Sequence, residues 1–351
     1  MPVFTIRNTD IRFAWLTNYL ETWLSSQLWK QMTIATIAYE YRALVNEFAL
    51  LTTGSTAGTE FQVHDFSYRG LSGTEDAAAS GAAFLLSTCG TDNIPGLYYA
   101  TKFYGANMKT GLIGTSVPAS EHSLASTGIA VDGELETYRK WITKDYPTGI
   151  VSVISDTLDF FRVVTEFATE LKYDILNRQP NALGLAKVVF RPDSGCPVKI
   201  LTGYLPQEIR WAADFSNAVR TDIAYCIETG RKLSEPEIKG AVQCLWDIFG
   251  GTTTEQGYKQ LHERVGLIYG DSITLERAEQ ILKRLAKKGF ASTNVVFGVG
   301  SYTCQYLTRD SMGIAVKATA AVVDGQTYAL SKDPTTDDGT KKSAKGLLRV
   351  E

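Results

Sequence analysis

The chain has 351 residues and a mass of 38.5 kDa, enough for one large α/β domain or for two domains with a sizeable core. Hydrophobic residues make up 44% of it and charged residues 21%, which excludes the disordered and membrane-spanning classes. The 35 basic and 38 acidic residues nearly cancel, so the charge gives no indication of nucleic-acid or membrane partners.

The five cysteines are scattered without a Cys-x-x-Cys pair, and there are only three histidines. A zinc site is therefore not expected, and reduced thiols fit a cytoplasmic protein. The segment Met1–Thr5 lacks the basic and apolar stretches of a signal peptide, and no apolar run reaches the ~20 residues that span a membrane. The predicted location is the cytoplasm.

The first 50 residues predict two amphipathic helices, around Phe13–Trp23 and Ile34–Leu51, that pack on later parts of the chain. Residues 54–128 are rich in Gly, Ser and Thr, with polar motifs between short helical patterns. This composition is typical of loops, where functional residues concentrate.

From residue 148, short apolar runs end in polar residues and alternate with helical patterns such as Leu275–Leu285. The runs and the residues after them are Gly149–Ile154 before Asp156, Lys187–Phe190 before Arg191 and Asp193, Val265–Tyr269 before Asp271, and Asn294–Phe297 before Gly298 and Gly300. The pattern predicts an α/β fold, with a barrel-like, mostly parallel sheet and surrounding helices. Ligands bind at the carboxyl ends of such strands, so these exits predict a sugar-phosphate site.

Two further segments complete the domain prediction. Residues 206–262 are predicted to be helices that cover the sheet, and the alternation in residues 314–319 with the Asp324-Gly325 turn predicts a β-hairpin. The predicted domains are N-terminal helices at 1–53, an α/β barrel-like core at 54–310 with a helical covering segment at 206–262, and a hairpin with a polar tail at 311–351.

Each candidate residue has a structural alternative when it is considered alone. The Gly298/Gly300 turn binds a phosphate or only packs tightly. The aspartates at 156, 193 and 271 accept ribose hydroxyls, hold Mg²⁺ through water, or cap the helices that follow. His122 is an acid, a base, a nucleophile or a structural hydrogen-bonding group. The loop with Phe66 and Arg69 binds a flat ring and a phosphate, or is simply packed.

Seven motifs occur in an order that links these residues. They are His64-Asp65-Phe66-x-Tyr68-Arg69-Gly70, Gly90-Thr91-Asp92, Ser116-Val117-Pro118-Ala119-x-Glu121-His122-Ser123, Arg191-Pro192-Asp193-Ser194-Gly195, Gly270-Asp271, Phe297-Gly298-x-Gly300 and Leu307-Thr308-Arg309-Asp310. The ordered set resembles the nicotinamide phosphoribosyltransferases of the type II phosphoribosyltransferase family over most of residues 3–350.

The resemblance implies a reaction in which nicotinamide and 5-phosphoribosyl 1-pyrophosphate give nicotinamide mononucleotide and pyrophosphate, with Mg²⁺ on the pyrophosphate. It implies that Phe66 stacks on the nicotinamide ring, Arg191 contacts its amide carbonyl and Asp92 accepts its amide N–H. The remaining implied roles are Asp193 and Asp271 on the ribose hydroxyls, Asp156 close to the sugar, Arg69, Arg309 and the backbone of Gly300-Ser301 on the phosphate, and Lys317 and Lys332 on the pyrophosphate side.

His122 matches a histidine that this family phosphorylates with ATP to improve substrate binding and to drive the reaction. The resemblance also implies a homodimer with active sites at its interface. No residue set is predicted to bind a metal ion without substrate.

The sequence departs from the family in three places. Ser301 and Tyr302 replace a glycine-rich run, which adds bulk near the phosphate, and residues 206–262 align poorly. The chain is expected to begin and end inside a full-length member, and therefore to lack an N-terminal part that supplies an aromatic residue across the dimer. The resemblance also implies that residues 311–351 are a remnant of a second, β-rich domain that the missing part completes.

Three alternatives stay open at this point. One is a nicotinate phosphoribosyltransferase, against which Asp92 argues because its carboxylate would repel the substrate carboxylate. The others are a binding module without catalysis and an inactive fragment that needs a complementary N-terminal chain.

Overall fold

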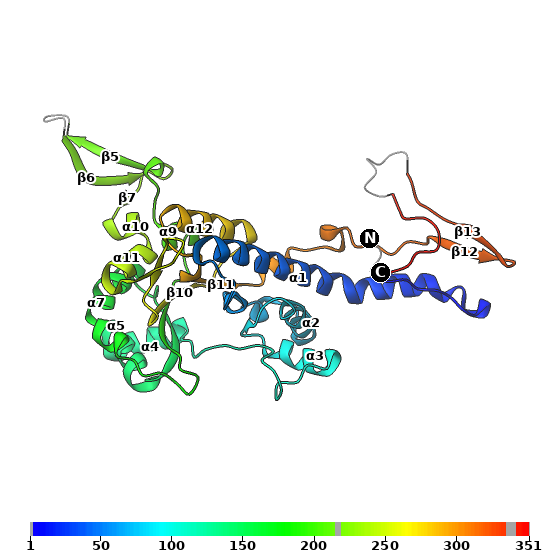
Figure 1. Cartoon of the computed structure of the whole chain (residues 1–351), viewed down its shortest axis with the longest axis horizontal. Helices are drawn as coiled ribbons and strands as arrows, with labels where there is room; N and C mark the ends of the chain where they lie inside the picture. The colour runs from blue at the N-terminus through cyan, green and yellow to red at the C-terminus, as the bar shows by residue number, and fades with distance from the viewer. Residues whose placement is uncertain (1–2, 215–218, 335–341, 351) are drawn as a thin grey trace. The chain divides into compact units, whose positions relative to one another are not determined.

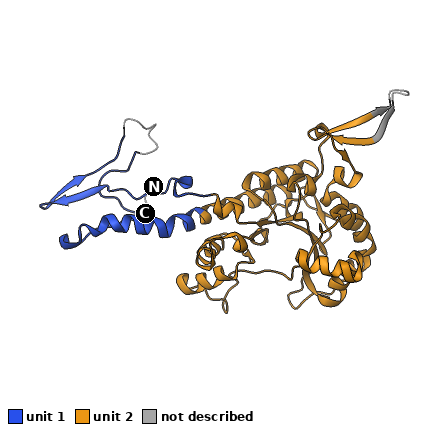
Figure 2. Cartoon of the chain, turned by 180° about the vertical axis from the view of Figure 1, so that it is seen from behind, with its two compact units in different colours: residues 1–33, 307–351 blue, residues 34–306 orange. Residues whose placement is uncertain are grey.

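The computed structural model describes residues 3–214, 219–334 and 342–350, with the side chains of residues 213–222 outside the description. The chain divides into two compact units, residues 34–306 and residues 1–33 together with 307–351 (Figure 2).

The unit of residues 34–306 is built on a six-stranded sheet in the order β2-β1-β11-β10-β4-β3, and every adjacent pair is parallel. The strands are β1 (Val63–Asp65), β2 (Gly90–Thr91), β3 (Gly149–Ile154), β4 (Ala186–Arg191), β10 (Val265–Tyr269) and β11 (Val295–Val299). All five residues of β10 are buried, as expected of a strand covered on both faces. The predicted parallel α/β sheet is confirmed.

One short segment contacts both edges of this sheet. Thr115 forms a bridge to Gly90 of β2, and Ala119 forms one to Ser152 of β3. Backbone hydrogen bonds from Thr115 N–H to the Cys89 carbonyl (2.7 Å) and from Ser152 N–H to the Pro118 carbonyl (2.8 Å) hold the segment in place. The sheet is therefore curled, and residues 115–119 join its two edges in a barrel-like closure.

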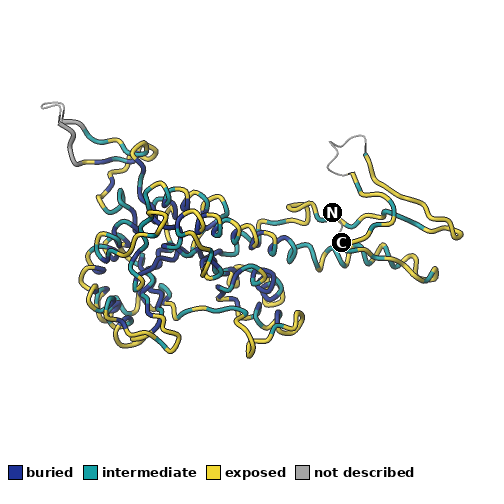
Figure 3. The backbone as a smooth tube through the Cα atoms, viewed as in Figure 1, coloured by how far each residue is buried: buried dark blue, intermediate teal, exposed yellow. Residues whose placement is uncertain are grey.

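Helices surround the sheet (Figure 1). They are α2 (Thr74–Phe84), α3 (Ile94–Tyr104), α4 (His122–Asp132), α5 (Glu134–Lys140), α6 (Phe160–Arg162), α7 (Ala168–Glu170), α8 (Lys172–Leu176), α9 (Pro197–Thr202), α10 (Glu235–Lys239), α11 (Ala241–Phe249), α12 (Leu275–Lys287) and α13 (Tyr302–Gln305). The predicted apolar face of α12 is buried at Ala278, Ile281, Leu282 and Leu285. Figure 3 shows the buried residues gathered on the strands and on the inner sides of the helices.

The prediction of two helices before residue 54 was wrong in one respect, because α1 is a single helix over Leu16–Thr53. Residues 24–33 contain no Gly or Pro to end it. Within the core unit its later turns bury Ile34, Ala38 and Val45, and the hydroxyl of Tyr41 donates to the Ile273 carbonyl at 3.2 Å. No helix in the described ranges is long and apolar enough to cross a membrane.

The prediction that residues 206–262 are helical was wrong for most of the segment. An antiparallel sheet of β5 (Ile209–Asp214), β6 (Val219–Cys226) and β7 (Lys232–Leu233) precedes α10, and a ladder of β8 (Gly251–Thr253) and β9 (Lys259–Leu261) follows α11. Ile209 and Trp211 alternate in the strand pattern and pack with the buried residues Ala224, Cys226 and Leu233. This period of two was too short to stand out among the charged residues.

The second unit contains the first turns of α1, a 3-10 helix η8 (Arg309–Met312) and a hairpin of β12 (Ala320–Val323) and β13 (Gln326–Ala329). The predicted Asp324-Gly325 turn is confirmed, with φ values of 50° and 78° that fit a tight hairpin turn. The strand begins at Ala320 instead of Ile314. Residues 335–341 of the polar tail lie outside the described residues.

Candidate active site

The motif residues of the core unit follow the carboxyl ends of the parallel strands. Phe66 follows β1, Asp92 follows β2, Asp156 follows β3, Arg191 ends β4 and is followed by Asp193, Asp271 follows β10, and Gly300 follows β11. Because all six strands are parallel, these ends lie along one edge of the curled sheet.

The ring of Phe66 lies directly against the backbone of two neighbouring strand ends. A Cβ atom added to Gly298 would lie 2.3 Å from Cδ2 of the ring, so only glycine leaves room for it. A Cβ added to Gly270 would lie 2.9 Å from Oδ1 of Asp193 and 3.3 Å from the ring. The half-buried ring and the Asp193 carboxylate therefore converge on Gly270, which gives the site an aromatic face beside a negative group.

Asp156 connects two predicted catalytic residues. Its Oδ2 accepts hydrogen bonds from the backbone N–H of Asp193 (2.9 Å) and from the hydroxyl of Ser194 (2.6 Å). Its Oδ1 lies 3.6 Å from Nε2 of His122 and accepts no hydrogen bond within the described residues. The side chain is 4% exposed, so it is a fixed part of the site.

The helices after the strands have other caps, which removes the capping alternative for the three aspartates. Asp159 caps α6 through the N–H of Arg162, and Thr274 caps α12 through the N–H of Arg277. The N-cap of α9 is Cys196. The carboxylates at the strand ends are therefore free for other interactions.

Asp193 stands in a negative environment. Burial raises its pKa, the positive charge of Arg191 opposes this, and the carboxylates of Asp156 and Asp271 raise the pKa further. Asp271 is exposed. A site that gathers three carboxylates in this way favours hydroxyl donors and cations over a free anion.

Two guanidinium groups share the carboxylate of Glu121. Its Oε1 lies 3.2 Å from Nη2 of Arg69 and 3.4 Å from Nη2 of Arg191. The Arg191 side chain is 6% exposed and also donates to the Ser120 carbonyl, whereas the Arg69 side chain is 82% exposed. The structure thus brings these two predicted substrate contacts to one acidic residue.

Asp92 accepts a short hydrogen bond at Oδ1 from the hydroxyl of Ser116, and its backbone N–H donates to the Asp65 carbonyl at 3.0 Å. The N-cap residue of the following helix α3 is Asn93. Asp92 is exposed. Burial lowers the pKa of His64, and the negative charge of Asp92 partly offsets this by raising it. The carboxylate is therefore open to a ligand at the end of β2.

His122 is the first residue of α4. Its Nδ1 lies 3.2 Å from the hydroxyl of Thr157, and its Nε2 faces Asp156. The side chain is 45% exposed. A carboxylate beside Nε2 favours the tautomer with the proton on that nitrogen, which leaves the lone pair on Nδ1.

The remaining predicted residues fall into two groups. Gly300 and Ser301 follow β11, and a Cβ added to Gly300 would meet no atom within 4 Å, so there is open space on that side of its Cα. Arg309, Lys317 and Lys332 belong to the other compact unit, and their predicted phosphate contacts stay predictions.

The model of the nicotinate phosphoribosyltransferase (NAPRTase) family matches residues 61–350, which include every motif that lies along the sheet edge. The chain belongs to this family. The predicted resemblance to this family is thereby confirmed.

Three curated relatives are nicotinamide phosphoribosyltransferases. That of Acinetobacter baylyi is 55% identical over 351 residues, which cover 100% of this chain and 64% of that protein. Those of Mycoplasma pneumoniae and Xanthomonas campestris pv. campestris are each 33% identical, and the matches cover 98% and 99% of this chain and 67% and 64% of the relatives. The chain thus spans about two thirds of the length of these relatives.

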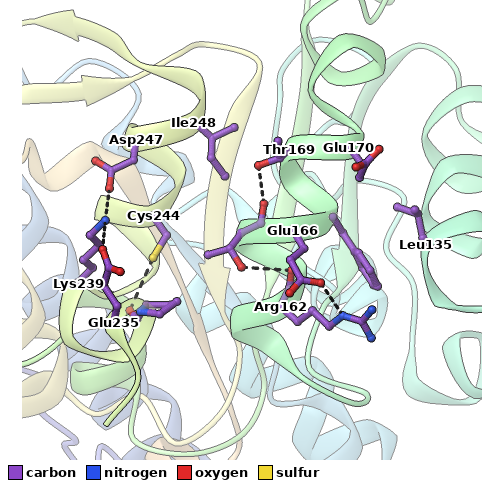
Figure 4. Close-up of a pocket in the computed structure, with 13 residues that line it drawn as sticks. Leu135, Arg162, Glu166, Thr169, Glu170, Glu235, Lys239, Cys244, Asp247 and Ile248 are labelled. Atoms are coloured by element: carbon purple, nitrogen blue, oxygen red, sulfur yellow. Dashed lines mark hydrogen bonds and ion pairs between the residues drawn. The ribbon is translucent and has the colours of Figure 1, made fainter. Parts of the chain in front are cut away.

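A separate cavity of about 660 Å³ lies between the helices around α7 and those around α11 (Figure 4). None of the predicted site residues lines it. Most of its charged side chains pair with each other: Lys239 contacts Glu235 (2.9 Å) and Asp247 (3.0 Å), and Arg162 contacts Glu166 (2.9 Å). This pairing leaves little free charge for a ligand, so the cavity is not the candidate active site.

Sequence reasoning missed several residues that shape the site. Glu121, Ser116 and Ser194 lie within the motifs but have no predicted role, and none is predicted for Thr157 or Tyr269 either. The hydroxyl of Tyr269 donates to the Ser194 carbonyl at 2.7 Å and so fixes the loop after β4. Their position in the sequence could have indicated them, because each lies within a few residues of a predicted substrate contact.

Proposed function

We propose that this protein transfers the phosphoribosyl group of 5-phosphoribosyl 1-pyrophosphate to nicotinamide, which yields nicotinamide mononucleotide and pyrophosphate. The observation that carries the proposal is the convergence of the Phe66 ring and the Asp193 carboxylate on Gly270, at the sheet edge where the family motifs end. The 55% identity to a nicotinamide phosphoribosyltransferase supports the choice of substrate.

The base is bound by three residues from three strand ends. Phe66 stacks on the pyridine ring, Arg191 donates to the amide carbonyl, and Asp92 accepts the amide N–H. The burial of Arg191 and its anchor on the Ser120 carbonyl support this role, since a guanidinium held rigidly needs little further ordering when the substrate binds.

In this proposal, carboxylates bind the ribose hydroxyls of the sugar phosphate, and positive or N–H groups bind its phosphate. Asp193 and Asp271 accept the ribose hydroxyls, with Asp156 behind them. Arg69 and the backbone of Gly300 and Ser301 bind the 5-phosphate. Arg309, Lys317 and Lys332 belong to the other compact unit, so their phosphate and pyrophosphate roles rest on the family resemblance alone.

The reaction needs no proton transfer. The C1′–O bond to pyrophosphate breaks and the leaving group takes the electron pair, while the lone pair of the pyridine nitrogen forms the new C1′–N bond. Positive charge develops on the ribose ring, so the carboxylates near C1′ stabilise it electrostatically. The protein's task is to align the ring nitrogen with C1′ and to stabilise the departing charge.

Mg²⁺ fits this site as part of the pyrophosphate substrate. No group of three potential metal ligands occurs within the described residues. Mg²⁺ is commonly held by one or two carboxylates and substrate phosphates, and Asp193 and Asp271 provide two carboxylates whose mutual repulsion a cation relieves. When bound, the ion neutralises charge on the leaving pyrophosphate.

His122 is proposed as the site of phosphorylation by ATP. A ring nitrogen attacks the γ-phosphorus, the N–P bond forms, and the bond to the bridging oxygen breaks to release ADP. Asp156 supports this role because its carboxylate lies 3.6 Å from Nε2, and a negative charge there favours the tautomer whose lone pair is on Nδ1. The N-terminus of the eleven-residue helix α4 also favours the added negative charge.

Nicotinate is the alternative substrate, because the family as a whole is named for its use. Asp92 disfavours it, since its exposed carboxylate would face the nicotinate carboxylate. We propose that the enzyme works as a homodimer in the cytoplasm. The scattered spacing of the cysteines, without a Cys-x-x-Cys pair, supports the compartment.

The test is product formation from nicotinamide and 5-phosphoribosyl 1-pyrophosphate. The 351-residue chain is assayed alone and together with the part of the longer relatives that it does not cover. Stoichiometric nicotinamide mononucleotide and pyrophosphate in either assay supports the proposal. Product in the second assay alone supports an inactive fragment that needs a complementary chain. Correct folding without product in both assays supports a binding module instead.

A further inference from the structure

Glu121 has a side chain that turns away from its own helix. It occupies the N-cap position of α4, yet the side chain accepts no hydrogen bond from the free N–H groups of that helix. The carboxylate instead faces Arg69 and Arg191, at 3.2 Å and 3.4 Å from the same oxygen. The Glu121 carboxylate therefore forms ion pairs with the two arginines instead of capping α4.

The two arginines depend on Glu121 to different degrees. Arg191 is buried and keeps a hydrogen bond to the Ser120 carbonyl, so it stays in place without Glu121. Arg69 is 82% exposed, and among the described residues its guanidinium donates only to Glu121. The carboxylate therefore mainly determines whether Arg69 is available to another anion.

Arg69 is also the residue to which we assign the substrate phosphate. A phosphate that approaches Arg69 competes with a carboxylate that already occupies the guanidinium. Glu121 is followed in the chain by His122. A phosphoryl group on His122 adds about 1.5 to 2 negative charges at neutral pH. Such a charge beside Glu121 repels its carboxylate and weakens its hold on both arginines.

We propose that Glu121 is an internal competitor for the phosphate-binding guanidinium of Arg69, and that phosphorylation of His122 displaces it. This inference rests on the proposed function for its ligand and for the phosphorylation step. It assigns Glu121 as a positioning residue that links the state of His122 to substrate affinity.

The test measures the affinity of the complete protein for 5-phosphoribosyl 1-pyrophosphate by calorimetry, with and without ATP. Without ATP, Glu121→Gln is expected to bind the ligand about 1.5- to 5-fold more tightly than the wild type, the range for an exposed ion pair. The gain in affinity that ATP produces in the wild type is expected to shrink by the same factor in the variant.

The matched control is Glu279→Gln on α12, which removes the same charge from an exposed pair with Lys283 (2.7 Å) and is expected to behave as the wild type. A double-mutant cycle with Arg69→Ala makes the assignment specific. In the Arg69→Ala background, Glu121→Gln is expected to have no effect on affinity, because the competing contact is already lost.

Weaker or unchanged binding by Glu121→Gln without ATP would overturn the inference and make Glu121 a clamp that orders Arg69. If Glu121→Gln still increases the affinity for 5-phosphoribosyl 1-pyrophosphate in the Arg69→Ala background, the inference is overturned as well. Absence of an ATP effect in the wild type contradicts the displacement step, while the comparison without ATP still decides the competition. Absence of binding by the wild type contradicts the proposed function itself.

Discussion

Asp156 joins His122 to Asp193: one carboxylate oxygen lies 3.6 Å from the imidazole and the other accepts the backbone N–H of Asp193 at 2.9 Å. One nearly buried side chain therefore faces the proposed phosphorylation site and also holds the backbone of a proposed ribose contact.

Asp156→Ala leaves the N–H of Asp193 and the hydroxyl of Ser194 without this acceptor. We expect the free energy of unfolding to fall by about 1–3 kcal/mol, as for other lost partners of buried polar groups. Asp156→Asn should cost less because its amide oxygen can still accept. Urea denaturation measures the free energy of unfolding of both variants, with Asp132→Ala on α4 as the control at an exposed position. A loss no larger than that of the control would show that the Asp156 contacts add nothing to stability.

His122 is expected to carry acid-labile phosphate after incubation of the complete protein with ATP, because a P–N bond hydrolyses in acid. His122→Ala should abolish the incorporation of labelled γ-phosphate, and His262→Ala should retain it. Equal labelling of the two variants would exclude His122 as the phosphorylated residue.

Gly298→Ala tests the position of the Phe66 ring without removing the ring. The added Cβ would lie 2.3 Å from Cδ2, so the ring must move. We expect the KM for nicotinamide to rise about 2- to 12-fold, which corresponds to the loss of about 0.5–1.5 kcal/mol of aromatic stacking. Gly111→Ala is the matched control, because a Cβ there meets no atom within 4 Å. An unchanged KM in a folded Gly298→Ala protein would argue against stacking by Phe66.

Glu208 provides a pH-dependent test of the packing between α9 and α12. Burial alone would raise the pKa of Glu208, but hydrogen bonds from Arg284, the Leu205 N–H and Lys199 outweigh it and lower the pKa from 4.5 to about 2. A lowered pKa means that the contact stabilises the fold above about pH 4.5 and is lost as the pH falls towards 2.

Glu208→Gln is therefore expected to lower the free energy of unfolding by about 1.5–3 kcal/mol at pH 7, the range for hydrogen bonds to charged groups. The difference from the wild type should shrink as the pH drops from 4.5 to 2. Glu263 is 80% exposed and pairs with Arg264, so Glu263→Gln is the control. A difference independent of pH would assign the effect to packing instead of charge.

The sequence allowed the sheet and its functional edge to be predicted because buried parallel strands are runs of Val and Ile that end in polar residues. Helix α12 was also predictable, since its apolar face repeats over thirteen residues. The strands at 209–226 were not recognised, because their alternation is brief and lies among charged residues.

The pairing of Glu121 with Arg69 and Arg191 was not predictable from spacing. The partners are 52 and 70 residues from Glu121 in the sequence, and only the curl of the sheet brings the three together. The same holds for Ser116 and Asp92, which meet because residues 115–119 pass along the sheet edge.

The most direct test of the account is the ratio of kcat/KM for nicotinamide to that for nicotinate, measured on the complete wild-type protein and on Asp92→Asn. The account predicts a ratio that favours nicotinamide in the wild type. Loss of a hydrogen bond to a charged group, about 1.5–3 kcal/mol, should cut the use of nicotinamide by about 10- to 150-fold in the variant. The use of nicotinate should stay level or rise. An equal fall for both substrates, with an unchanged ratio in a folded variant, would contradict the assignment of Asp92 and of the amide as substrate.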